Sequence, residues 1–524
     1  MKKYFLIVCV CFYLVELCAA IKMSAIFSDN MLIQQNQLVE IWGSADVNSI
    51  VKVTAKNVQS STKADSNGKW RLHLPAMKGS FEPFTIQIFE NSKLAKEIKN
   101  VLCGEVWIAG GQSNMAMELS GIKGSIEFVA KMQESKIRYF LHPTPISKMK
   151  SMKSGLGSRP CDDFIEGAKW IDVDKKNVWS TSAVAFIFAY NLMEKINVPV
   201  GIVFNAVAGS KMECWVSQQA YESSPNFKTI RDKFNECLEK YDYKKNLKKF
   251  NAKVKKYNAD KKSGKKNIPP SWTVADFMRP WIDSPYMWKS PYMFYNIRIH
   301  PMRNYTAKGV VWYQGESNEV EGFESAFECL ISEWRKYFNN PNLPFICVQL
   351  PSYKADKWAE KRQAQKRVAD KVQNTYIIPT IDTGEKNDIH PHDKMEIGVR
   401  LANEASIFVY KSRPSVKYPC EICKIEFIQN GVKISLTSKP QIKGKLRGFE
   451  VLSNGKWITV DENIKIKISK SPCDNTSWIV YLNFQTIKNL EGIRYLWKSW
   501  AKPDVCLYGM NNLPVFPFKF LKKD

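Results

Sequence analysis

The sequence of 524 residues predicts an α/β protein, in which a parallel sheet with covering helices is flanked by N-terminal and C-terminal antiparallel β domains. Between residues 101 and 410, apolar strand-like segments alternate with helix-like segments, a pattern typical of parallel sheets. In residues 21–100 and 411–524, short segments with period-two alternation are separated by turn residues, which predicts antiparallel strands. Because 44% of the residues are hydrophobic, a disordered or fibrous chain is excluded.

Residues 1–20 have the features of a secretory signal peptide. Two lysines follow Met1, an apolar run extends from Tyr4 to Leu14, and small residues precede the expected cleavage point near Ala20. The run is well short of the ~20 apolar residues that a membrane-spanning helix needs. We therefore expect no membrane insertion after signal cleavage. The mature chain would be secreted or lumenal in the endomembrane system (the lysosome included), or periplasmic in a bacterium.

The sequence has 13 cysteines, three of them in the expected signal peptide. In an oxidising compartment the other ten permit disulfides without fixing their pairing. Cys420 and Cys423 have the spacing of a zinc knuckle, but no second Cys or His pair follows, so no metal site is predicted. Asn304 and Asn475 begin N-glycosylation sequons, which a eukaryotic host would use.

Much of the formal net charge of +26 lies in a predicted helical insertion at about 228–266. Its part 240–266 contains twelve lysines and two aspartates. Apolar residues recur there at spacings of three and four, which predicts one apolar stripe on a lysine-coated helix. The stripe consists of Leu247, Phe250, Val254 and Tyr257. The segment is either a patch for an anionic partner or a solvated insertion. We favour the insertion and expect no nucleic-acid partner, because no nucleic-acid motif accompanies the lysines.

Polar segments follow several predicted strands of the central domain, where ligands bind in sheets of this kind. Ser113 follows the strand at 104–109 and a glycine pair, on a tight turn that enters a helix. Such a turn presents the hydroxyl outward and offers helix N–H groups to an oxyanion. His390 follows the strand at 376–381 and is a candidate base for a serine hydroxyl. Asp388 could fix its tautomer.

Two further residues follow other predicted strands. Gln314 carries an amide donor that could face an oxyanion, and Gly209 allows a backbone N–H to approach a substrate closely. Structural alternatives exist for the main candidates. Ser113 could equally be a helix cap, and His390 could be a surface residue of a polar loop.

Three motifs are specific in combination. They read Gly-Gly-Gln-Ser-Asn-Met at 110–115, Trp-Tyr-Gln-Gly-Glu-Ser-Asn at 312–318 and Asn-Asp-Ile-His-Pro at 387–391. With further matches near both ends, the mature chain resembles the sialate O-acetylesterase family of the SGNH (GDSL-like) hydrolase superfamily. The chain departs from the family pattern at 208–210, where Ala-Gly-Ser replaces Gly-Gly-Thr, and in its lysine-rich insertion.

The resemblance implies an SGNH-type sheet and a serine esterase that removes O-acetyl groups from sialic acids without a metal or organic cofactor. Ser113 matches the family nucleophile, and His390 and Asp388 match its base and orienting acid. The backbone N–H groups of Ser113 and Gly209 would form the oxyanion hole with Gln314. The expected partner is O-acetylated sialic acid or another acetylated glycan.

Two other functions stay open. The same triad serves acetylxylan esterases and other carbohydrate acetylesterases. A non-catalytic glycan-binding protein could keep the fold, although it would not need a complete Ser, His and Asp set. The sequence predicts neither the oligomeric state nor the preferred O-acetyl position.

Overall fold

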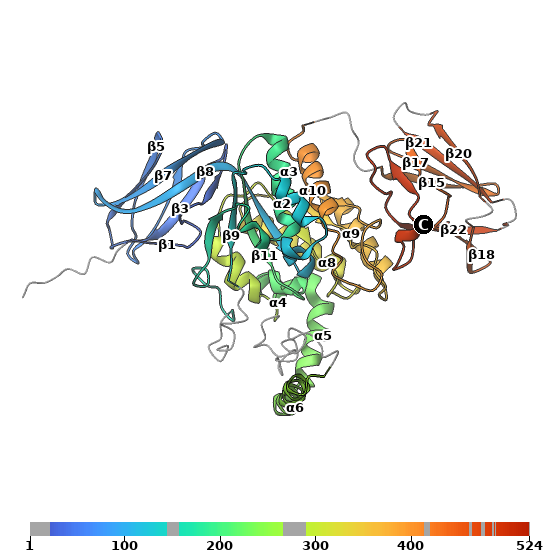
Figure 1. Ribbon diagram of the computed structural model, residues 1–524, viewed down its shortest axis with the longest axis horizontal. Helices are drawn as coiled ribbons and strands as arrows, with labels where there is room; N and C mark the ends of the chain where they lie inside the picture. Colours follow the sequence, from blue (N-terminus) through green and yellow to red (C-terminus); the bar gives the residue numbers. More distant parts are fainter. Residues whose placement is uncertain are drawn as a thin grey trace, which may run out of the picture.

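A computed structural model describes residues 21–143, 157–265, 290–412, 420–460, 464–472, 477–484, 487 and 489–522. The predicted signal peptide at 1–20 and the sequon residue Asn475 lie outside these residues. Figure 1 shows three regions along the longest axis of the molecule: β strands at the N-terminal end, a mixed α/β body, and β strands at the C-terminal end. The mixed α/β class predicted from the sequence is confirmed.

The N-terminal region contains two groups of paired strands. In one, β3 pairs with both β1 and β6, and all pairs are antiparallel. In the other, β4 pairs with β5 and β7, and β7 pairs with β8. The short β2 runs parallel to β8. The strands are β1 (Lys22–Met23), β2 (Leu32–Gln34), β3 (Val39–Ser44), β4 (Ile50–Ala55), β5 (Val58–Lys63), β6 (Lys69–Leu74), β7 (Ser80–Glu90) and β8 (Lys93–Gly111).

Strand β8 connects this region to the α/β body. Its first half pairs with β7, and its second half lies at the centre of the parallel sheet between β11 and β12. From Val101 to Gly111 every residue is buried, as expected for a central parallel strand. The strand crosses residue 100, where the sequence predicts the end of the first domain.

The central sheet has the order β10-β9-β11-β8-β12-β13-β14. All neighbours are parallel except β10, which is antiparallel to β9. The carboxyl ends of the parallel strands therefore meet at one edge. The strands beside β8 are β9 (Ile137–Leu141), β10 (Lys169–Asp172), β11 (Val200–Ala206), β12 (Gly309–Tyr313), β13 (Phe345–Val348) and β14 (Thr375–Ile378).

Helices cover both faces of this sheet. On one face α3 and α10 share an apolar core with α1, and on the other α8 and α9 contribute to a second core. A side chain at Gly398 of α10 would lie 2.6 Å from the Cβ of Ile187 in α3, so this glycine permits the close approach of the two helices. The helices are α1 (Ser113–Ala116), α2 (Ser125–Lys131), α3 (Ala183–Ile196), α4 (Gln218–Ser223), α8 (Phe323–Tyr337), α9 (Trp358–Lys371) and α10 (Met395–Phe408).

The C-terminal region is antiparallel throughout its described strands. One sheet has the order β15-β16-β21-β20, another β19-β18-β22-β24, and β17 pairs with β23. The strands are β15 (Ile422–Ile428), β16 (Gly431–Leu436), β17 (Pro440–Ile442), β18 (Phe449–Ser453), β19 (Lys456–Thr459), β20 (Ile464–Lys470), β21 (Trp478–Phe484), β22 (Leu490–Tyr495), β23 (Leu507–Gly509) and β24 (Phe518–Leu521).

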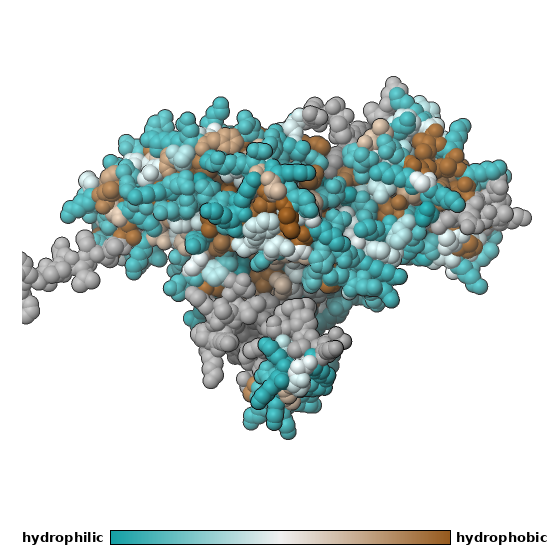
Figure 2. All heavy atoms as spheres, in the orientation of Figure 1, coloured by the Kyte–Doolittle hydropathy of each residue, from teal (hydrophilic) through white to brown (hydrophobic). Residues whose placement is uncertain are grey.

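The predicted lysine-rich insertion forms two helices, α5 (Lys228–Glu239) and α6 (Tyr243–Lys262). Figure 1 shows α6 standing away from the α/β body, and Figure 2 shows a largely hydrophilic surface over it. The lysines of α6 are exposed, whereas Leu247, Val254 and Tyr257 of the predicted stripe are half-buried. The side chain of Phe250, the fourth residue of the stripe, lies outside the part that the structure describes.

Two further predictions concern cysteines and membranes. In the described part of the chain Cys103, Cys161, Cys237, Cys329, Cys347 and Cys420 are free thiols, and Cys473 lies outside that part. None of the helices found in the described residues combines the length and the apolar character that crossing a membrane requires.

Candidate active site

The predicted site residues follow four strands whose carboxyl ends lie at the same edge of the sheet. Ser113 follows β8, Gly209 follows β11, Gln314 follows β12, and His390 lies between β14 and α10. The loops after β8, β11 and β12 contact one another directly. Gln112 Nε2 donates to Ser317 Oγ at 3.2 Å, and Gln314 Nε2 donates to the carbonyl of Ser210 at 2.9 Å. The structure thus brings three of the predicted loops together.

Ser113 begins the one-turn helix α1, directly after the end of β8. Gly111 has φ of +136°, and a Cβ on it would lie 2.1 Å from the carbonyl oxygen of Tyr313. Only glycine fits this close crossing of two backbones, which fixes the sharp exit of the chain toward Ser113. Ser113 is half-buried. Its backbone N–H has no hydrogen-bond partner among the described residues, so it can donate to a ligand.

The His390 loop is fixed to α10 at its start and has a local hydrogen bond at its centre. Arg400 of α10 makes two 2.8 Å hydrogen bonds to the carboxylate of Asp382, and both side chains are largely buried. Such a bidentate pair fixes the loop against the helix. Further along, Asp388 Oδ1 accepts the backbone N–H of His390 at 2.8 Å, which holds these two residues together.

Asn114 joins the His390 loop to the Ser113 turn. This fully buried side chain donates from Nδ2 to the carbonyl of Ile389 at 2.9 Å and to the carboxylate of Glu316. Its Oδ1 accepts from Lys394 Nζ at 2.6 Å. One amide therefore lies next to Ser113 in the chain and holds the residue that precedes His390.

Burial affects both ionisable partners of Asn114. It raises the pKa of Glu316, which the hydrogen bond from Asn114 partly offsets. It lowers the pKa of Lys394 from 10.5 to about 7, an effect that Glu316 opposes. Neither group pairs with the other directly, and Asn114 connects them. Removal of one charge leaves the other buried with less compensation.

We expect Lys394→Met to destabilise the protein by ~3 kcal/mol below pH 7, because the carboxylate of Glu316 then lacks a nearby buried cation. The double variant with Glu316→Gln should lose less than the sum of the single effects, since both charges are gone. Denaturant unfolding of the four proteins measures this coupling. Additive losses would contradict it.

The lowered pKa of Lys394 also predicts how the stability of the protein depends on pH. Between about 7 and 10.5 the unfolded chain holds a proton that the folded chain has released. Stability contributed by this group therefore rises with pH over that range. Lys394→Met should lack this rise relative to the wild type, and parallel stability curves for the two proteins would exclude it.

His390 is half-buried and has a pKa below its ordinary value of 6.5, because burial penalises the imidazolium. Asp388 opposes this shift by attracting the charged form. Neither the Ser113 hydroxyl nor the His390 ring has a hydrogen-bond partner among the described residues. Catalytic hydrogen bonds are often loose before substrate binds and tighten in the complex.

The three predicted oxyanion donors differ in availability. Gly209 has φ of +66°, and its N–H donates to none of the described residues, as for Ser113. Gln314 is 1% exposed, and one of its amide protons goes to the carbonyl of Ser210. Its Oε1 is buried without a partner in the described chain. Gln314 thus holds the turn after Gly209, with one amide proton left for another acceptor.

His392 lies in a different environment from His390. Its Nδ1 is 3.2 Å from Glu385 Oε1, and Glu385 also pairs with Lys123. Ligand atoms of Glu385, Asp388 and His392 lie within 4.8 Å of one another, the one group in the described residues with the spacing for a metal ion. The sequence predicts no metal here, and Asp388 and Glu385 already accept hydrogen bonds from the protein.

No role is predicted from the sequence for Asn114, Glu316 or Lys394. Asn114 and Glu316 stand inside the motifs that were singled out, so their positions were a usable signal. Lys394 gave none, because one lysine among 77 basic residues has no distinguishing pattern until the fold buries it.

Comparisons with known proteins define the class of this protein: it is an enzyme, a carboxylic ester hydrolase. Residues 281–406 match the family described as carbohydrate esterase, sialic acid-specific acetylesterase. This match contains the Gln314 and His390 loops and does not extend to Ser113. The predicted resemblance to the sialate O-acetylesterase family is confirmed.

Full-length relatives extend the similarity. Sialate O-acetylesterase of Mus musculus is 25% identical, covering 94% of this chain and 93% of its own. The Homo sapiens sialate O-acetylesterase is 23% identical, covering 94% and 91%. The crystal structure of XAC1771, a carbohydrate acetylesterase from Xanthomonas citri, matches with a TM-score of 0.74 at 23% identity, covering 95% of this chain and 99% of that one. This likeness establishes a shared fold.

Proposed function

We propose that this chain hydrolyses O-acetyl esters of sialic acids, with Ser113 as nucleophile, His390 as base and Asp388 as orienting acid. The bridge through Asn114 carries the proposal, because it fastens the loop of His390 to the turn of Ser113. The free N–H groups of Ser113 and Gly209 support the assignment of an oxyanion site. We also propose that the central sheet is of the SGNH type, within the predicted domains 21–100, 101–410 and 411–524.

In the proposed acylation step, Ser113 Oγ attacks the acetyl carbonyl carbon while His390 accepts the hydroxyl proton. Asp388 stabilises the imidazolium that forms. The carbonyl oxygen becomes an oxyanion, which receives hydrogen bonds from the Ser113 and Gly209 N–H groups and from Gln314. Such donors each typically contribute ~3 kcal/mol to transition-state stabilisation.

Collapse of the tetrahedral intermediate breaks the bond to the sugar oxygen. His390 returns its proton to this oxygen, and the sugar alcohol leaves. Water then attacks the acetyl-Ser113 ester while His390 accepts a proton from it. Acetate departs, and Ser113 recovers its proton. The lowered pKa of His390 keeps the imidazole in the neutral form that this role requires.

Two substrate classes fit this chemistry. The relatives that cover 94% of the chain are named sialate O-acetylesterases, which favours acetylated sialic acid. A different carbohydrate acetyl ester, such as acetylated xylan, is the second candidate, because XAC1771 shares the fold and is named a carbohydrate acetylesterase. The complete set of Ser113, His390 and Asp388 disfavours a non-catalytic glycan-binding protein.

The test is acetate release from 9-O-acetylated sialic acid and from acetylated xylan, measured in parallel with purified protein. We expect faster release from the sialic acid at equal ester concentration. Faster release from xylan would favour the second candidate. No release from either substrate, or from a small acetyl ester, would contradict an esterase.

Gln314→Ala is expected to lower kcat by ~10²–10³ with little change in KM. The neutral amide gains most when the acetyl oxygen becomes an anion, whether Gln314 donates directly or keeps the Gly209 turn in place. Steady-state kinetics on a small acetyl ester measures the effect. A raised KM with unchanged kcat would instead make Gln314 a substrate-binding residue.

A further inference from the structure

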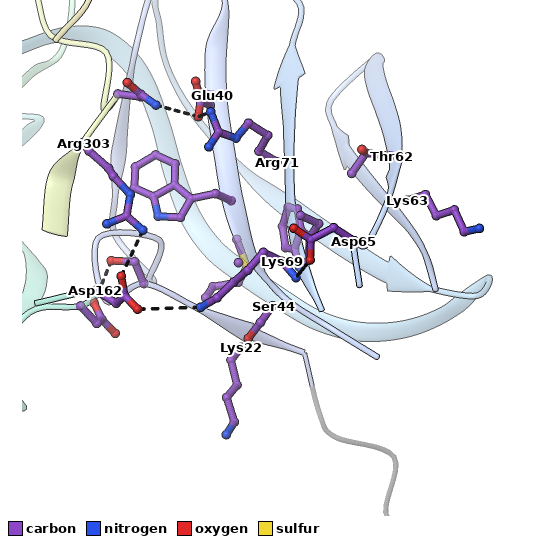
Figure 3. A pocket seen from close by; sticks show the side chains of 17 residues that line it. Lys22, Glu40, Ser44, Thr62, Lys63, Asp65, Lys69, Arg71, Asp162 and Arg303 are labelled. Carbon is purple, nitrogen blue, oxygen red and sulfur yellow. Dashed lines mark hydrogen bonds and ion pairs between the residues drawn. The ribbon is translucent and has the colours of Figure 1, made fainter. Parts of the chain in front are cut away.

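A cavity of about 550 Å³ lies in the N-terminal region, outside the candidate active site. One wall is the sheet of β1, β3 and β6, and the other includes residues 162–163 and 303–304 of the α/β body. Figure 3 shows Arg303 entering from one side, and Arg71 and Lys69 from the strands opposite. Its lining combines aromatic rings with charged groups, which suits a ligand that is both apolar and polar.

The cavity is separate from the proposed catalytic residues. Arg303 and Asn304 precede the amino end of β12, whereas Gln314 follows its carboxyl end. The cavity and the candidate site therefore belong to opposite edges of the parallel sheet. A ligand in the cavity would not take part in the chemistry at Ser113.

Hydrogen bonds join the two walls, so the cavity exists before any ligand binds. Ser24 Oγ donates to Asp163 at 2.8 Å, and Asn304 Nδ2 donates to Glu40 at 3.1 Å. Just beyond them, Tyr305 donates to the carbonyl of Leu32 at 2.8 Å. A preformed site binds without the cost of ordering its walls.

Trp42 has an unusual position on β3. Val39 and Ile41 of this strand are buried, while Glu40, Trp42 and Ser44 belong to the opposite, more exposed face. Trp42 is therefore a large aromatic ring on a polar face. Its partners across the β3–β6 ladder are charged, with Arg71 opposite Trp42 and Lys69 opposite Ser44.

The ring of Trp42 is half-buried and packs edge-on against Phe27, with centroids 4.5 Å apart. The edge contact holds the indole in place, and part of the ring stays accessible from the cavity. Sugar rings present apolar C–H faces to such flat aromatic surfaces, while their hydroxyls need polar neighbours.

The cationic side chains of the cavity have hydrogen-bond donors that strong ion pairs do not use. The ion pairs of Arg71 with Glu40, Arg303 with Asp162, and Lys69 with Asp162 measure 3.8, 3.4 and 4.0 Å. These distances exceed the ~2.7–2.9 Å of strong charge-assisted hydrogen bonds. The guanidinium of Arg71 makes no hydrogen bond to a described residue. Its planar fork matches a carboxylate.

The carboxylates of the cavity are better satisfied. Asp163 accepts from Ser24 Oγ and from the N–H of Ala25, and Asp65 accepts the N–H groups of Asn67 and Lys69. The lining therefore has cationic side chains with unused hydrogen-bond donors, whereas hydrogen bonds within the protein already engage much of its negative charge. A ligand with an anionic group fits this balance better than a cation.

We propose that this cavity binds a glycan that carries a carboxylate, with a sugar ring on Trp42 and the carboxylate on Arg71 and Lys69. The choice of a glycan rests on the proposed function, whereas the aromatic and cationic chemistry does not. Such a site would hold a non-reacting part of a large sialylated or uronic-acid glycan, while another part reaches Ser113.

The test measures binding by calorimetry with ligands that contain no O-acetyl group, so that the result does not depend on esterase activity. We expect sialyllactose to bind and neutral lactose to bind at least ~10-fold more weakly, because it lacks the carboxylate. An oligogalacturonide, whose carboxylates belong to uronic acids, shows which acidic sugar the cavity prefers. If it binds about as tightly as sialyllactose, the cavity accepts acidic glycans in general. If it binds much more weakly, the cavity selects sialic acid. Equal binding of lactose and sialyllactose, or no binding of either acidic glycan, overturns the proposal.

The variant Lys69→Gln/Arg71→Gln should weaken sialyllactose binding at least ~10-fold. A matched control, Lys78→Gln/Lys93→Gln, removes the same charge from exposed residues outside the cavity and should bind normally. Both variants should hydrolyse a small acetyl ester at the wild-type rate. Trp42→Phe should weaken binding while the melting temperature stays close to the wild type. Unchanged binding by Lys69→Gln/Arg71→Gln, or equal loss in the matched control, overturns the proposal.

Discussion

Replacing Ser113 by Ala is expected to lower ester hydrolysis by ~10⁴–10⁶ while leaving the fold intact. Ser113 is half-buried, and its hydroxyl has no hydrogen-bond partner among the described residues, so its removal breaks no hydrogen bond with them. In the proposed reaction it forms the bond to the acetyl group, and no neighbouring group replaces it. Initial rates on a small acetyl ester, together with thermal unfolding, measure both parts of this prediction.

Ser317→Ala is the matched control. Ser317 is another half-buried serine, on the loop after β12, and its hydroxyl accepts a hydrogen bond from Gln112 at 3.2 Å. We expect near-normal turnover and a small loss of stability. Substantial residual activity of Ser113→Ala, or equal inactivation of Ser317→Ala, would mean that Ser113 is not the nucleophile.

The second large effect concerns the two histidines of the loop before α10. His390→Ala should lower kcat/KM by ~10⁴, because no base remains for the serine proton. His392→Ala should change it little, since His392 pairs with Glu385, whereas Asn114 holds Ile389, the residue directly before His390. Kinetics of both variants separate the roles, and the reverse ranking would move the base by two residues.

The pH profile of kcat/KM offers an independent readout for His390. Burial lowers its pKa, so the neutral imidazole persists to a lower pH than for an exposed histidine. The acid limb of the profile should therefore lie below pH 6.5. Because Asp388 raises this pKa, Asp388→Asn should shift the limb further down while it lowers kcat. A limb above 6.5, or one unmoved by Asp388→Asn, would contradict the assignment.

Much of the α/β body could be predicted from hydrophobic periodicity. Among the helix-like segments that alternate with strands between residues 101 and 410, the structure forms α3 (Ala183–Ile196) and α10 (Met395–Phe408). Both have long apolar faces that pack on the sheet, and such faces leave a clear pattern in the sequence. Glycine at 110–111 marked the sharp turn before Ser113, because no other residue fits against Tyr313.

Other features depend on distant contacts and left no local pattern. The buried amine of Lys394 donates its hydrogen bond to Asn114, which lies 280 residues earlier in the chain. The continuity of β8 through residue 100 depends on pairing with β7 on one side and with β11 and β12 on the other. The cavity around Trp42 requires that residues 303–304 come to lie beside β3. These are tertiary arrangements, which periodicity does not encode.

Labelling with a fluorophosphonate tests the central proposal most directly, since this reagent reacts covalently with an activated serine of an esterase. The protein is inactivated with the reagent and digested, and the modified peptide is identified by mass spectrometry. We expect one modified residue, Ser113, and no labelling of His390→Ala under the same conditions. Modification of another serine, or labelling of Ser113 that does not depend on His390, would contradict the proposed catalytic residues.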